Sequence, residues 1–192
     1  MKKGNKKTES DFRNELYEKI KSEFSGYTVC NCGKETNLLY QIIIDGNGDV
    51  KPKPDELKNP LRGSYAFQTD MLIKKKNIPI VAIEIKFLGI TTHDILTYST
   101  KAMKHKEIYP YLRYGLIAGN IEKIPNRFFI HNQGFDFAIA LFYNENGTLK
   151  DNELESTIKL LKRQIKDAES LLSLLNTESG AKLFNRNVEV IS

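Results

Sequence analysis

The chain has 192 residues and a formal charge of +5, with lysines concentrated in residues 2–7, 74–76 and 101–106. A chain of this length can bury one sizeable core, and without repeats or a long linker we expect a single domain. The positive charge favours a polyanion as partner. No stretch approaches the ~20 apolar residues of a membrane span, and the basic tail of residues 1–8 lacks the apolar core of a signal peptide, so we expect a mobile tail on a cytoplasmic protein.

The first half of the chain is expected to hold one helix and several strands. Residues 8–20 form a helix in this interpretation, capped by Ser10 or Asp11, with Phe12, Leu16, Ile20 and Phe24 at helical spacing. Strands follow at residues 27–32 and 38–44, with a turn at 45–49 and a proline-rich surface loop at 51–60. We expect Cys30 and Cys32 to be reduced thiols of the core, because further cysteine ligands for a zinc ion are missing.

Charged side chains interrupt two strongly apolar runs of β character, which is costly unless those charges have a function. The run from Tyr65 to Ile73 contains Gln68 and Asp70, and the run from Ile80 to Leu88 contains Glu84 and Lys86. Alternation places Glu84 and Lys86 on one face of their strand, opposite Val81, Ile83, Ile85 and Phe87. The polar residues 74–77 predict an antiparallel hairpin between the two runs.

If the two strands pair in this way, Asp70 can lie across from Glu84. Two close carboxylates repel each other unless a proton or a cation lies between them, and oxygen ligands suit Mg²⁺, with Mn²⁺ as a substitute. Lys86, next to them on the same face, fits a role in positioning and polarising a water molecule. The alternative interpretation is that Glu84 and Lys86 form a salt bridge on an exposed sheet face.

The order Asp70, a gap, then Glu84-Ile85-Lys86 resembles the PD-(D/E)xK nuclease superfamily. One position departs from the motif, because Thr69 stands where its name expects proline. The resemblance implies an α/β, restriction-endonuclease-like core at residues 1–150, with a mixed central sheet flanked by helices. It also implies a Mg²⁺ ion held by Asp70, Glu84 and the carbonyl of Ile85.

Further site residues follow from the resemblance. Nucleases of this family project a glutamate from the first helix toward the metal, a role for Glu15, with Glu18 as the alternative. The helix expected at residues 92–111 would pack beside the active site and offer Lys101 and Lys104 to the DNA backbone. Lys75 and Gln68 complete the expected nucleic-acid contacts. For each single lysine, the alternative is a merely solvated helix face.

After strands expected at residues 114–119 and 135–143, residues 151–192 are expected to form a helical extension. A coiled-coil-like apolar seam runs along it, formed by Leu154, Ile158, Leu161, Ile165, Ala168, Leu172 and Leu175. Such a stripe must be buried against its own domain or against a partner. A homodimer or a heteromeric subunit would suit an enzyme that cuts both strands of DNA.

Together these patterns predict a Mg²⁺-dependent endonuclease acting on double-stranded DNA, in particular a small Type II restriction endonuclease or its subunit. Asp70, Glu84 and Lys86 would be its catalytic residues. The alternative is a non-catalytic nucleic-acid-binding or assembly subunit, in which the charged strand residues form only ion pairs and the last helix recruits a partner.

Overall fold

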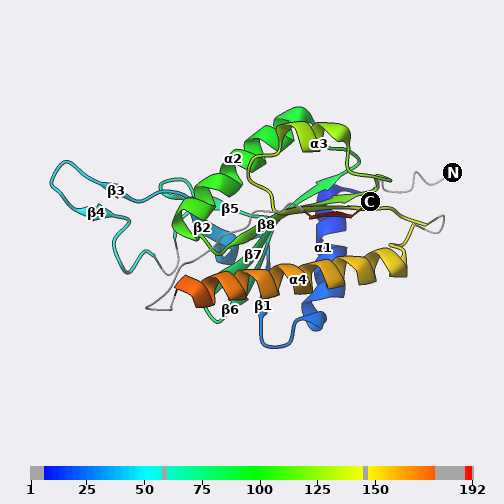
Figure 1. Cartoon of the computed structure of the whole chain (residues 1–192), viewed down its shortest axis with the longest axis horizontal. Coiled ribbons are helices and arrows are strands. Elements are labelled where there is room, and N and C mark those ends of the chain that lie inside the picture. The colour runs from blue at the N-terminus through cyan, green and yellow to red at the C-terminus, as the bar shows by residue number, and fades with distance from the viewer. Residues whose placement is uncertain (1–6, 58–59, 145–146, 176–188, 192) are drawn as a thin grey trace.

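The computed structural model describes residues 7–57, 60–144, 147–175 and 189–191. It contains a central mixed β-sheet between two layers of helices (Figure 1). The helices α2 (Thr92–Ile108) and α3 (Asn126–His131) lie on one side, and α4 (Asp151–Leu175) lies on the other. The α/β class, the mixed sheet, its helical flanks and the long C-terminal helix are as the sequence predicts. Of the mobile tail expected at residues 1–8, residues 1–6 lie outside the described residues, and Thr8 is the cap of the first helix. The helical extension expected at residues 151–192 is helical only as far as Leu175: residues 176–188 lie outside the described residues, and residues 189–191 form a strand that pairs with the central sheet.

The central sheet has the strand order β1-β6-β7-β8-β9-β10. The bounds are β1 Thr28–Asn31, β6 Met71–Lys75, β7 Ile78–Phe87, β8 Arg113–Gly119, β9 Phe137–Leu141 and β10 Glu189–Ile191. β1, β6 and β7 pair antiparallel, whereas the pairs from β7 to β10 are parallel. The predicted hairpin is the β6–β7 pair, and helical crossovers connect the parallel strands.

Side chains of β7 alternate between two apolar layers, as its sequence predicts. Val81, Ile83 and Ile85 pack with α1 (Glu9–Ile20) and α4 (Asp151–Leu175). Ala82 packs on the other face with α2 (Thr92–Ile108) and α3 (Asn126–His131). Because Glu84 is two residues beyond Ala82, its carboxylate enters the layer that α2 covers.

Both α1 and α2 begin with a capping box. Thr8 caps α1, because its hydroxyl accepts a hydrogen bond from the N–H of Asp11 while the Asp11 carboxylate accepts one from the N–H of Thr8. Thr91 and Asp94 form the same reciprocal pair at α2. The expected cap at Ser10 or Asp11 is therefore wrong: a threonine followed three residues later by a carboxylate satisfies two free backbone groups at once.

The apolar run at residues 65–73 is two strands rather than the expected one. β5 (Ala66–Gln68) pairs with β2 (Asn37–Leu39) in a separate small sheet, and the chain bends before β6 begins. Hydrogen bonds to Thr36 hold this bend: the Thr69 N–H donates to its carbonyl at 3.0 Å, and the Thr36 hydroxyl donates to the Thr69 carbonyl at 2.7 Å. Asp70 therefore lies at the break, directly before β6.

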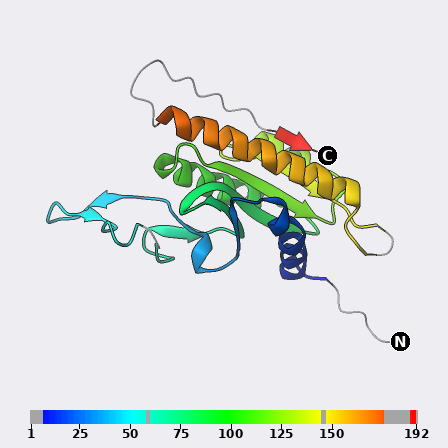
Figure 2. The ribbon, with the colours of Figure 1, turned by 90° about the horizontal axis from the view of Figure 1, so that it is seen from below.

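A ribbon of β3 (Ile43–Ile44) and β4 (Val50–Lys51) extends away from the central sheet (Figures 1 and 2). The Asp45 carboxylate closes its turn by accepting from the N–H groups of Asn47 and Asp49. The expected strand at 38–44 is thus divided between β2 and β3. Two short 3-10 helices, η1 (Lys21–Glu23) and η2 (Lys34–Thr36), flank β1.

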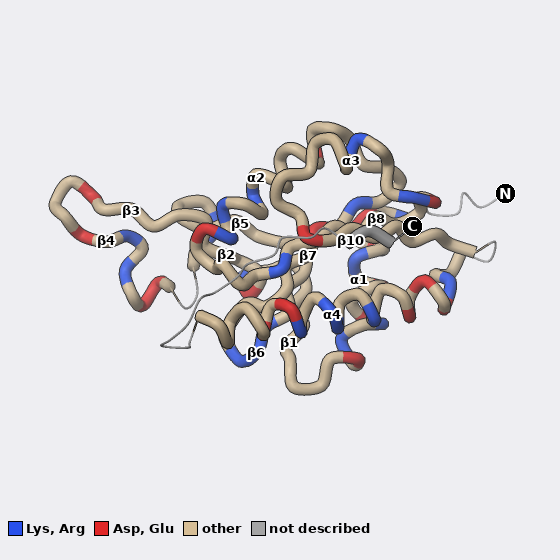
Figure 3. The backbone as a smooth tube through the Cα atoms, in the orientation of Figure 1, with Lys and Arg blue, Asp and Glu red and all other residues tan. Residues whose placement is uncertain are grey.

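The apolar stripe of α4 packs against the sheet. Leu160, Leu161, Ile165 and Ala168 belong to the same core cluster as β7, and α4 contacts β7, β8 and β9. Of the two alternatives for this helix, the structure shows packing on its own sheet. Charges of both signs lie along α4 (Figure 3). No described helix is both long and apolar enough to cross a membrane.

Candidate active site

Asp70 and Glu84 lie across from each other on the β6–β7 hairpin. Met71 pairs with Ile83, and one further step along this antiparallel register brings Asp70 opposite Glu84. The N–H of Ile85 donates a hydrogen bond to Oδ2 of Asp70 at 2.8 Å and fixes that carboxylate. The structure therefore brings together the two carboxylates that the sequence singled out.

Glu84 is almost completely buried, with 1% of its surface exposed. Its Oε1 accepts hydrogen bonds from the Tyr114 hydroxyl and from Nζ of Lys101, the latter at 2.7 Å. Burial raises the pKa of Glu84 to about 7, and the negative charge of Asp70 acts in the same direction, while Lys101 opposes the shift. A cation between the two carboxylates would stabilise their ionised forms.

Lys86 lies on the same face as Glu84 but closer to the end of β7. Its Nζ is 3.4 Å from Oδ1 of Asp94 and 3.7 Å from Oε2 of Glu9, and it lies 5.1 Å from the centre of the Tyr98 ring. Burial disfavours the ammonium ion, yet Tyr98, Glu9 and Asp94 outweigh it and raise the pKa of Lys86 above its usual value. Lys86 is therefore a cation and hydrogen-bond donor at neutral pH.

The start of α2 positions Asp94 beside Lys86. The capping box with Thr91 holds the Asp94 carboxylate, which accepts from the Thr91 N–H at 2.8 Å and hydroxyl at 2.6 Å. Burial alone would raise the pKa of Asp94, but these hydrogen bonds and the charge of Lys86 lower it. One carboxylate thus caps the helix and fixes the lysine.

The donor set fits Mg²⁺ better than zinc. Asp70, Glu84 and the Ile85 carbonyl offer only oxygen atoms, and Mg²⁺ commonly binds one or two carboxylates together with water and phosphate oxygens. Among the described residues no group of three or more His, Cys, Asp and Glu side chains could hold a metal ion. Cys30 is a free thiol in the core, as expected, whereas Cys32 is free but exposed.

Glu15 does not join this cluster. Its Oε2 accepts hydrogen bonds from the Tyr143 hydroxyl at 3.0 Å and from Nζ of Lys7. Glu9 and Arg13 lie on the face of α1 that meets the hairpin. Glu9 contacts Lys86, and a guanidinium nitrogen of Arg13 is 3.7 Å from Oδ1 of Asp70. Glu18 pairs with Lys21 of the same segment. The helical carboxylate beside the site is thus Glu9, six residues before the expected Glu15.

Two of the four expected nucleic-acid contacts lie next to the carboxylates. Lys101 bridges Glu84 and the backbone carbonyl of Gln68. The Gln68 amide is held by the Gly33 carbonyl, to which its Nε2 donates at 2.8 Å. Lys101 is therefore a partly buried ion-pair partner of Glu84 rather than a free lysine on the helix surface.

The other two expected contacts lie apart. Lys104, one turn along α2 from Lys101, is half-exposed and 3.5 Å from a carboxylate oxygen of Glu107. Lys75 is at the opposite end of β6 from Asp70, where its Nζ is 2.5 Å from Glu169 on α4. Lys75 therefore does not share a surface with the carboxylate pair.

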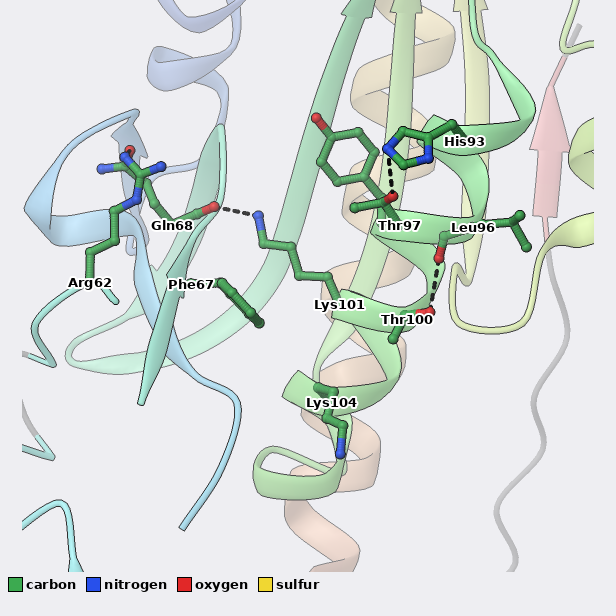
Figure 4. Close-up of a pocket in the computed structure, with 10 residues that line it drawn as sticks. Arg62, Phe67, Gln68, His93, Leu96, Thr97, Thr100, Lys101 and Lys104 are labelled. Atoms are coloured by element: carbon green, nitrogen blue, oxygen red, sulfur yellow. Dashed lines mark hydrogen bonds between the residues drawn. The ribbon is translucent and has the colours of Figure 1, made fainter. Parts of the chain in front are cut away.

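A pocket of about 630 Å³ opens between α2 and β5, beside the Lys101 side chain. Figure 4 shows Gln68 and Phe67 on one wall and Lys101, Lys104 and Thr97 on the α2 wall. Lys101 reaches across from α2 to Gln68, so it separates the pocket from Glu84.

Sequence reasoning missed five residues of the site: Glu9, Arg13, Asp94, Tyr98 and Tyr114. The Thr91-x-x-Asp94 spacing at the start of a helix could have identified Asp94 as a capping residue near the end of β7. Tyr114 could have been noted as a hydroxyl at the start of the otherwise apolar run at residues 114–119. The contacts of Glu9 and Arg13 depend on the angle at which α1 crosses the sheet, because the apolar stripe of Phe12, Leu16 and Ile20 shows which face of the helix is buried but not which flank meets the hairpin.

No protein-family model matches this chain, and no curated protein sequence matches it significantly.

Proposed function

We propose that the protein is a metal-dependent endonuclease that hydrolyses phosphodiester bonds of DNA. The observation that carries this proposal is the position of Asp70 opposite Glu84, with Lys86 next on the same strand face. This is the arrangement that the PD-(D/E)xK resemblance implies. Such residues suit phosphate chemistry, because carboxylates can hold a divalent cation while an ammonium group faces the reacting oxygens.

The order of elements supports the same proposal. A helix, α1, precedes β1, the β6–β7 hairpin carries the motif, and α2 connects it to the parallel strand β8. This helix, strand, hairpin, helix, strand order is the one expected of a restriction-endonuclease-like core. The β2–β5 pair and the β3–β4 ribbon are insertions between β1 and β6 in this interpretation.

Each site residue has a distinct role in the proposed reaction. A bound Mg²⁺ would supply Lewis acidity at the phosphate and at a coordinated water. Asp70, Glu84 and the Ile85 carbonyl would hold it, with Asp70 fixed by the Ile85 N–H. Lys86, anchored by Asp94 and Glu9, would donate a hydrogen bond that orients the attacking water.

The assignment to a Type II restriction endonuclease or a subunit of one is a narrower proposal. It rests on the size and basic charge of the chain. The internal packing of α4 removes one of its supports, because the apolar stripe proposed for a dimer is used against the sheet.

A non-catalytic nucleic-acid-binding or assembly subunit is the second candidate, and one observation favours it. Lys101 pairs with Glu84, Asp94 and Glu9 pair with Lys86, and Arg13 approaches Asp70. These ion pairs compensate the buried charges without a metal ion. This candidate predicts DNA binding without cleavage.

Incubation of supercoiled plasmid with the purified protein, with and without Mg²⁺, separates the two candidates. The endonuclease should convert the plasmid to nicked or linear DNA in Mg²⁺ alone, and Asp70→Asn and Lys86→Met should abolish conversion without loss of folding. Glu155→Gln on the exposed side of α4 is the control and should cut like the parent protein. Cleavage by Asp70→Asn at the parent rate would overturn the assignment.

The same assay tests which acid of α1 belongs to the site. Glu9→Gln should slow cleavage, because it removes one of the two carboxylates that anchor Lys86. Glu15→Gln should cleave normally, because Glu15 contacts Tyr143 and Lys7 instead. A loss of cleavage confined to Glu15→Gln would restore the original expectation for that residue.

A further inference from the structure

The pocket between β5 and α2 combines an aromatic wall with a cationic rim. Phe67 contributes the aromatic side chain and is 40% exposed. Tyr40 stacks on it with 4.1 Å between ring centres, and His105 meets it at 90°, so its ring is held in place before any ligand arrives. A fixed ring loses little conformational entropy when a flat ligand stacks on it.

The ionisable side chains that line the pocket are basic. Arg62, Lys101 and Lys104 line the pocket together with His93, and none of the described residues that line it is an aspartate or glutamate. The guanidinium of Arg62 contacts the amide oxygen of Gln68 at 3.4 Å, and among the described residues it makes no salt bridge. A ligand for this pocket therefore combines a flat ring with negative charge, and 630 Å³ is within the range of small-molecule sites.

The pocket is next to the candidate active site, because the Lys101 side chain contacts both. Lys101 lines it and also contacts Glu84, and Gln68, whose carbonyl accepts from Lys101, lines the opposite wall. A chain with alternating rings and phosphates could therefore place a ring in the pocket and a neighbouring phosphate beside the carboxylates.

We propose that this pocket holds one unstacked nucleotide of a DNA strand, with its base against Phe67 and its phosphates near Arg62 and Lys104. The preferred substrate is then single-stranded or locally unpaired DNA rather than an intact duplex, which keeps the nuclease proposal but argues against the narrower Type II restriction endonuclease assignment. A paired base in B-form DNA has both faces covered by its neighbours, so it can enter such a pocket only after leaving the stack. This inference makes the proposed nuclease function more specific, and the choice of DNA as the ligand rests on that proposed function.

Binding without a divalent cation tests the pocket apart from catalysis. Fluorescence anisotropy in EDTA would compare a labelled oligothymidylate with a hairpin duplex of equal length. The single strand should bind more tightly, and Phe67→Leu, which keeps an apolar side chain but loses the ring, should weaken its binding about tenfold. Phe129→Leu, at an exposed phenylalanine outside the pocket, should bind like the parent. Circular dichroism would show that each variant is folded.

A matched arginine pair tests the cationic rim. Arg62→Gln should reduce the salt dependence of single-strand binding by about one phosphate contact. Arg127→Gln, at an exposed arginine of α3 outside the pocket lining, should leave the dependence unchanged. Equal salt dependence in the two variants would remove Arg62 from the proposed contact.

Three results would overturn the inference: tighter binding to the hairpin, parent-like binding by Phe67→Leu, or a free nucleotide such as dTMP binding as tightly as the oligonucleotide. The last would assign the pocket to a free nucleotide. Failure here together with Mg²⁺-dependent plasmid cleavage would leave the nuclease proposal intact. Selective single-strand binding without cleavage of any DNA would overturn the nuclease proposal and keep the pocket.

Discussion

Nζ of Lys101 lies 2.7 Å from Oε1 of Glu84, which joins α2 to the middle of the central sheet at a place almost closed to water. Glu84 comes from β7 and Lys101 from the third turn of α2, 17 residues later. The pair compensates the charge of Glu84, which is 1% exposed. Its contribution to stability can be separated from any role in catalysis.

Lys101→Met should destabilise the protein by about 1–3 kcal/mol, because the buried Glu84 loses its cation and a hydrogen-bond donor, while protonation of a carboxyl whose pKa is already about 7 limits the loss. Urea unfolding at neutral pH measures the loss. The double variant Lys101→Met/Glu84→Gln should regain part of it, since a neutral amide can still accept the Tyr114 hydrogen bond. Strictly additive losses in the double variant would show that the two residues do not stabilise each other.

His105 should make folding stability depend on pH. Burial lowers its pKa from 6.5 to about 4, and the charge of Lys101 adds to this shift, against the hydrogen bond with the Leu39 carbonyl. Between these two pH values the unfolded chain binds a proton that the folded chain excludes, so stability falls as pH falls through this window. The loss amounts to about 3 kcal/mol between pH 6.5 and pH 4.

The matched measurement is urea unfolding of the parent and of His105→Gln across the same pH range. Carboxylates titrate in both proteins, so the difference between the two curves isolates the histidine. The advantage of the parent should shrink toward low pH. A constant difference would mean that His105 has the same pKa in both states.

Gly115 should be intolerant of any side chain. A Cβ atom there would lie 2.1 Å from the ring of Phe137, which is fully buried on the neighbouring strand. Gly115→Ala should therefore cost about 1–3 kcal/mol through overpacking. Gly46→Ala is the control, because a Cβ atom there has nothing within 4 Å. Thermal unfolding of both variants gives the comparison, and equal midpoints would contradict the packing.

Because α4 packs against the sheet along one face, we expect two leucine-to-alanine substitutions in this helix to differ in their cost to stability. Leu161→Ala removes a fully buried side chain from the core under β7 and should cost about 2–5 kcal/mol. Leu175→Ala, at a position 38% exposed, should cost much less.

The midpoint of thermal unfolding of the parent protein should not change with protein concentration, because the apolar stripe of α4 is buried within one chain. A concentration-dependent midpoint would instead indicate a dimer.

The sequence by itself determined the local features of this protein. The alternation in β7 assigns Glu84 and Lys86 to one face, the 74–77 turn makes the β6–β7 hairpin, and together they bring Asp70 opposite Glu84. The same holds for the helical spacing of Phe12, Leu16 and Ile20, which are all buried. These features depend on side-chain period and turn chemistry over a few residues, which a sequence displays directly.

Only the tertiary structure decided which distant groups meet. Hydrogen bonds to Thr36, 33 residues away, break the 65–73 run before Asp70, and the angle at which α1 crosses the sheet brings Glu9 rather than Glu15 to Lys86. Packing on the sheet likewise settles which surface α4 covers. Such contacts depend on how whole helices and strands pack against one another. A helix or strand with a regular apolar face can bury that face in several different arrangements, so its sequence alone does not select one.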